Sequence, residues 1–94
     1  MINLGVTLGS VATPLASGTR NVYASLLIIQ NNSGATLNLG GPTVSATRGI
    51  TISTGTPGGS ATMQFNFPRG CCLNNTYLFG TNGDIVDICY EPSE

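Results

Sequence analysis

The chain has 94 residues, enough for one domain and too few for two, and its net charge is −1. Charged residues make up 7% of the sequence, with no lysine and no histidine, whereas about 25% is usual. This inventory argues against a nucleic-acid partner, against a zinc or other cofactor site, and against the common nucleophile and base pairs of enzymes.

Strand-sized apolar runs alternate with clusters of Gly, Pro, Asn and Ser, and helical periodicity is absent. This rhythm is typical of an all-β domain, and we expect a small antiparallel β-sandwich or barrel, jelly-roll-like, with about eight short strands. The predicted strands cover residues 4–8, 22–30, 36–39, 43–46, 49–53, 62–67, 76–79 and 85–90.

Residues 1–18 mix small, apolar and threonine side chains, and we interpret them as an N-terminal arm that pairs along part of its length or contacts a neighbour. The β domain itself is expected to cover residues 19–94. A surface with so little charge does not hold copies apart in solution, so we expect partners to cover much of it. In the arm, Met1, Ile2 and Leu4 are the candidate interface residues.

Two strands carry the strongest patterns. Residues 26–29 are apolar at every position, which predicts a strand that is central or lies against a second surface. This run is far shorter than the ~20 residues of a membrane span, so no membrane association is expected. In the strand over 62–67, Met63, Phe65 and Phe67 alternate with polar residues, which predicts one face in the core.

Towards the C-terminus, Asn82 and Gly83 predict a type I′ turn that joins residues 77–81 and 84–90 in a hairpin. In its second strand Asp87 lies opposite the apolar face, and we interpret it as a charge that protects an edge strand from unwanted pairing. The Gly-rich connection over 55–60 lacks the lysine and following helix of a phosphate-binding loop.

Few side chains offer chemistry. The carboxylates Asp84, Asp87, Glu91 and Glu94 gather near the C-terminus, but a chain this short leaves little room for a catalytic cleft, so we expect no enzyme. Cysteines occupy positions 71, 72 and 89 without metal-ligand spacing. They are interpreted as small buried side chains, and a disulfide from residue 71 or 72 to residue 89 stays open.

Arg20, Arg48 and Arg69 are the only basic residues, and each lies at the end of a predicted strand. One interpretation is that they are solubilising charges. The other is that they contact carboxylates of a neighbouring chain, because arginine is favoured at interfaces. The sequence leaves both interpretations open.

From residue 20 onward, the chain contains the strand and turn segments of residues 20–22 leading into Ser25-Leu26-Leu27-Ile28-Ile29-Gln30-Asn31, then Leu37-Asn38-Leu39-Gly40, and residues 44–45, 49–52, 78–80 and 85–90. These segments resemble small virion proteins of tailed bacteriophages. This group includes capsid cement (decoration) proteins and fibre-associated modules. Residues 1–18 carry none of the resemblance.

The resemblance implies a virion protein made in the host cytoplasm that binds the outside of an icosahedral capsid, often as a homotrimer, across the joints between subunits. Its partners would be the major capsid protein or other virion proteins. The alternative is a fibre, tail or carbohydrate-binding module, which would expose aromatic side chains for sugar stacking. Most aromatic residues here lie at strand positions that a core would occupy.

Overall fold

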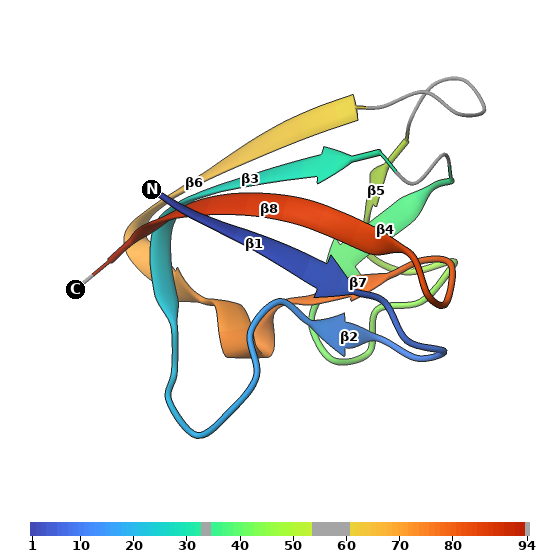
Figure 1. Ribbon diagram of the computed structural model, residues 1–94, viewed down its shortest axis with the longest axis horizontal. Helices are drawn as coiled ribbons and strands as arrows, with labels where there is room; N and C mark the ends of the chain where they lie inside the picture. Colours follow the sequence, from blue (N-terminus) through green and yellow to red (C-terminus); the bar gives the residue numbers. More distant parts are fainter. Residues whose placement is uncertain (33–34, 54–60, 94) are drawn as a thin grey trace.

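The computed structural model describes residues 1–32, 35–53 and 61–93, which form two packed antiparallel sheets of four strands (Figure 1). The first sheet contains, in spatial order, β1 (Ile2–Thr7), β8 (Ile85–Pro92), β3 (Tyr23–Asn31) and β6 (Ala61–Cys72). The second contains β2 (Thr13–Pro14), β7 (Tyr77–Phe79), β4 (Leu37–Gly40) and β5 (Ile50–Ile52). The predicted all-β sandwich is therefore confirmed.

The strand order is that of a jelly roll. Strand β1 pairs with β8, β2 with β7, β3 with β6 and β4 with β5, as in one long hairpin that is wound into two sheets. This winding brings the chain ends together (Figure 1), and the Met1 ammonium lies 3.5 Å from Glu91 Oε2. A short 3₁₀ helix, η1 (Leu73–Asn75), follows β6. Among the described residues no helix is long and apolar enough to cross a membrane.

The core lies between the sheets and follows the two-residue alternation of the strands. In β3, Leu27 and Ile29 are fully buried, while Leu26 and Ile28 lie half-buried on the outer face. Strand β3 lies between β8 and β6, so the predicted central strand is confirmed. The inner side chains of β6 pack against the core but stay partly exposed, because β6 is an edge strand; they are Met63, Phe65 and Phe67.

Two predicted strands differ from the structure, and one observed strand was not predicted. Residues 43–46 form a loop with one isolated bridge between Ser45 and Arg48, and Val44 is buried within it. The short strand β2 was not predicted, and it tolerates Pro14 because it lies at a sheet edge. The strand predicted over 62–67 continues to Cys72 after residues 67–70 bulge opposite Ser25.

The predicted type I′ hairpin at Asn82 and Gly83 is wrong, because β7 and β8 lie in different sheets. The turn does exist: the Asp84 N–H donates to the Thr81 carbonyl at 3.1 Å. Gly83 has a φ of +93° and Asn82 has no positive φ, which is the type II pattern. The dipeptide thus indicates a turn, but the type of turn depends on the crossing of the chain from one sheet to the other.

Residues 1–18 supply an edge strand to each sheet, β1 and β2. Because β1 covers β8, Asp87 does not lie on an edge strand, and its interpretation as edge protection is wrong. Its carboxylate lies on the exposed outer face and accepts a 3.4 Å hydrogen bond from Asn32. The predicted connection over 55–60 lies outside the described residues.

Candidate interaction surface

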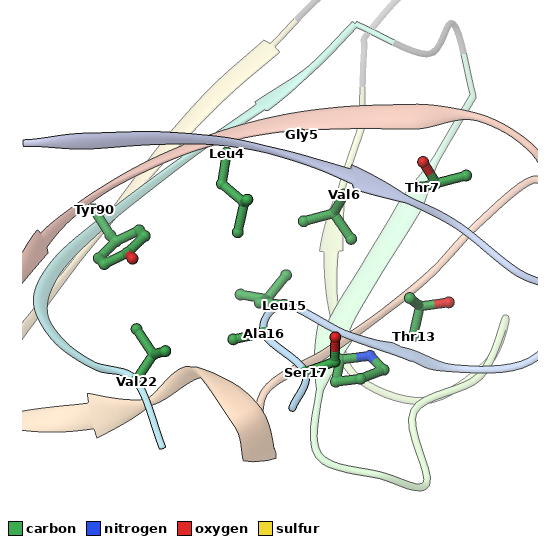
Figure 2. Close-up of a pocket in the computed structure, with 11 residues that line it drawn as sticks. Leu4, Gly5, Val6, Thr7, Thr13, Leu15, Ala16, Ser17, Val22 and Tyr90 are labelled. Atoms are coloured by element: carbon green, nitrogen blue, oxygen red, sulfur yellow. The ribbon is translucent and has the colours of Figure 1, made fainter. Parts of the chain in front are cut away.

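A groove of about 420 Å³ opens along the side of the sandwich where β1 and β2 form the two sheet edges (Figure 2). Leu4 and Val6 point into it from β1, and Tyr90 points into it from β8. Leu15 and Val22 close its floor from the segment that follows β2. We call this hollow the β1–β2 groove.

The groove exists because the two edge strands differ in length. Strand β1 has six residues and β2 only two, so part of β1 has no opposing strand in the second sheet. Val6 lies near Leu15 and is buried, whereas Leu4 is 38% and Ile2 43% exposed. These three residues share the inner face of β1 by alternation. The sandwich is therefore incompletely closed at the end where the chain starts.

The groove can bind a partner through apolar contacts and hydrogen bonds. Its walls combine aliphatic side chains with the hydroxyl groups of Thr7, Thr13, Ser17 and Tyr90. The Thr13 hydroxyl already accepts the Gly9 N–H at 2.9 Å and donates to the Val11 carbonyl at 3.1 Å. The lining residues carry no carboxylate, thiol or amine, so the groove offers no acid and base pair.

The structure brings together three of the six candidate interface residues. Met1, Ile2 and Leu4 are all exposed, and they lie in or directly before β1. The three arginines are also exposed but lie on other segments: Arg20 between β2 and β3, Arg48 between β4 and β5, and Arg69 in the bulge of β6. Because β6 continues past it, Arg69 does not mark a strand end as expected.

Ion pairs contribute little to the surface of the described residues. In the described part of the chain the one ion pair joins the Met1 ammonium to Glu91, and no arginine takes part in it. The three cysteines are free thiols. Cys89 donates to Asn3 Oδ1 at 2.9 Å, and the Cys71 sulfur lies 3.3 Å from Thr76 Oγ1. No group of three potential metal ligands occurs among residues 1–32, 35–53 and 61–93.

Two further hollows lie elsewhere. One of about 370 Å³ lies beside Gly5 and is bordered by Asn3, Asp87 and Cys89. The other, of about 290 Å³, lies on the opposite side of the sandwich and is lined largely by apolar side chains, including Phe65 and Phe67. The rings of these two residues stack with their centroids 6.3 Å apart.

The sequence pattern predicts the strand that borders the β1–β2 groove but not the groove itself. Alternation in residues 4–8 already places Leu4 and Val6 on one face. Val22 and Tyr90, which also line the groove, are distant from β1 in sequence, and no local signal joins them to β1. The chain matches no protein-family model, no curated protein and no solved structure.

Proposed function

We propose that the protein is a structural protein of a tailed-bacteriophage virion, a capsid cement (decoration) protein that binds the outside of the shell and stabilises it. The observation that carries this proposal is the combination of exposed apolar side chains with very little charge. Large hydrophobic residues that are at least 38% exposed are Met1, Ile2, Leu4, Val11, Tyr23, Ile50 and Ile85.

Such a surface suits permanent contact with another protein. Burying an unpaired charge costs roughly several kcal/mol of free energy, and a surface with few charges avoids that cost. Gly, Ser, Thr and Asn side chains on the remaining surface form hydrogen bonds without ion desolvation. The exposed apolar residues then contribute favourable burial when a partner covers them.

The jelly-roll topology is compatible with this role and does not by itself assign it. Jelly rolls occur in viral capsid domains and also in lectins and cupins, so the fold leaves several functions open. The virion assignment rests on the resemblance of the strand and turn segments from residue 20 onward. The cupin chemistry that uses histidine ligands has no counterpart in a chain without histidine.

The proposed mechanism is mechanical. A protein that bridges adjacent capsid subunits adds interface free energy that must be lost before the shell opens, and many bound copies make this gain collective. The partners are the major capsid protein or other virion proteins, and the resemblance implies a homotrimer as the binding form. No bond is made or broken in this mechanism.

A fibre, tail or carbohydrate-binding module is the second candidate. It is favoured by the stacked pair of Phe65 and Phe67 beside a hollow of about 290 Å³, since aromatic faces bind sugar rings. Both rings are only partly exposed and pack against the core. A glycan array with the purified protein tests this candidate directly.

The test of the cement proposal uses DNA-free shells of the phage whose genome encodes the chain. We expect the protein to co-sediment with these shells up to a saturating ratio and to raise the temperature at which they open. Shells from an unrelated phage are the control. Absence of binding together with an unchanged opening temperature would contradict the proposal, and sugar binding on the array would then favour the second candidate.

A further inference from the structure

The outer edge of β1 presents backbone hydrogen-bonding groups that have no partner among the described residues. Leu8 donates its N–H to the Asp84 carbonyl and accepts the Gly83 N–H, both at 2.8 Å, so its backbone faces β8. In an antiparallel ladder this orientation alternates, and the backbone groups of Asn3, Gly5 and Thr7 therefore face away from β8. They form a ready template for another strand.

This edge lacks the protection that the other three sheet edges have. Strand β2 has two residues and contains Pro14, β5 has three residues, and β6 carries Pro68 and Arg69 in a bulge. Strand β1 has six residues in continuous register with β8, and it contains no charged side chain, no proline and no bulge. It is the edge most open to strand addition.

We propose that β1 pairs with β1 of a second copy of this chain, antiparallel and around a twofold axis at Gly5. In this register Gly5 faces Gly5 of the second copy and Asn3 faces Thr7 of the second copy, so each outward-facing residue exchanges both of its hydrogen bonds. Leu4 lies beside Val6 of the second copy on the inner face. The two first sheets then form one continuous sheet.

A second copy fits this edge because the strand is complementary to itself. An antiparallel twofold pairing places each side chain next to one from an identical strand, so a charged strand would meet like charges, and β1 has none. The nearby Met1 ammonium is already paired with Glu91 of its own chain. Pairing also covers Ile2 and Leu4, which are exposed, and Leu4 lines the β1–β2 groove.

The pairing does not depend on the proposed virion role, and it gives the purified chain a twofold dimer in place of the homotrimer that the resemblance implies. Sedimentation of the purified chain tests it. The decisive variant is Gly5→Lys. A Cβ at Gly5 would lie 3.4 Å from Ile85 Cγ2, an ordinary contact, so the single chain accommodates a side chain there. At the twofold axis, however, two lysines would meet. We expect the wild type to be dimeric and Gly5→Lys to weaken self-association at least about tenfold.

Gln64→Lys is the matched control, because it adds the same charge to the outer face of the first sheet on the opposite edge strand, β6. We expect it to leave self-association unchanged. Thermal unfolding of both variants checks that the single chain still folds. A wild type that stays monomeric, or a dimer that only Gln64→Lys disrupts, would overturn the proposal.

Amide hydrogen exchange at single-residue resolution adds a readout specific for the register. In the dimer the amides of Asn3, Gly5 and Thr7 gain protection as concentration rises, whereas those of Leu4 and Val6, which face β8, are protected at every concentration. Uniform behaviour of these amides would also contradict the pairing. A trimer that Gly5→Lys leaves intact would overturn the strand pairing and leave the cement proposal standing.

Discussion

Asn31 is a fully buried polar side chain that joins the two sheets. It lies at the end of β3 in the first sheet, and its Nδ2 group donates to the Ile52 carbonyl of β5 in the second sheet at 2.8 Å. The same group donates to the Ala35 carbonyl at 2.8 Å. Buried carbonyls need such partners, because an unsatisfied polar group in a core costs free energy.

Replacing this side chain should therefore be costly at the scale of one residue. We expect Asn31→Ala to lower the free energy of unfolding by about 2 kcal/mol, since it leaves two carbonyls without this donor and removes packed atoms. Urea denaturation followed by circular dichroism measures the loss. The neighbouring Asn32→Ala is the matched control, because Asn32 is exposed and its 3.4 Å hydrogen bond to Asp87 is long. Equal losses for the two variants would contradict the role of Asn31 as a link between sheets.

At the scale of elements, the connection between β4 and β5 replaces a predicted strand with a folded loop. Val44 is buried in this loop and packs over the backbone of Gly49. Asn38 Nδ2 donates to the Ser45 carbonyl, and Thr51 Oγ1 donates to Asn38 Oδ1 at 3.2 Å. These contacts fix the loop against the second sheet, and they require a residue without a side chain at position 49.

Gly49→Ala tests this requirement. Gly49 has a φ of +122°, and an added Cβ would lie 2.6 Å from Val44 Cγ2 and 2.8 Å from the Leu39 carbonyl oxygen. We expect a loss of roughly 2–4 kcal/mol in unfolding free energy, from backbone strain together with overpacking. Gly41→Ala in the same connection is the control, because nothing lies within 4 Å of its Cβ position. Its effect should stay within about 0.5 kcal/mol. A tolerated Gly49→Ala would mean that the loop moves freely on the sheet.

The sequence predicts most strands because their alternation is local. Val86, Ile88 and Tyr90 alternate with Ile85, Asp87 and Cys89, which separates the two faces within a few residues, and the structure buries the first three. Strand pairing is different, since it depends on distant segments. The Asn82-Gly83 dipeptide indicates a turn, yet only the crossing between sheets decides that β7 and β8 do not pair. Asn31 gives no local sign that it links the sheets.

The same limit applies to the candidate surface. Exposure of Met1, Ile2 and Leu4 follows from an edge strand facing a much shorter one, and the sequence does not show which strands lie at edges. The sequence does show that these residues are apolar and uncharged. The direction in which the backbone groups of β1 point follows only from its register with β8.

At the scale of the whole molecule, the jelly-roll topology places the first and the last strand of the chain side by side in one sheet. Ile2 pairs with Tyr90 and Thr7 with Ile85, so the first sheet contains both ends of the chain. Val6 is 5% and Leu8 2% exposed, and both belong to the core between the sheets. Residues 1–8 are thus part of the folding unit, and their loss would uncover the edge of β8 and the core side chains that Val6 and Leu8 cover.

Deletion of residues 1–8 should therefore abolish cooperative folding. Burying Val6 and Leu8 contributes about 1.5–3 kcal/mol each, and the lost pairing with β8 adds to this. The sum is a large part of the about 5–15 kcal/mol that holds a small domain together. We expect the shortened chain to show no cooperative thermal transition by circular dichroism. Removing only Met1 and Ile2, which are 61% and 43% exposed, is the control and should preserve the transition with a modest shift. If the shortened chain instead melts cooperatively at the same temperature as the full chain, β1 is an arm that the folded domain does not need. Pairing of two β1 strands in a dimer would then not change the stability of either domain.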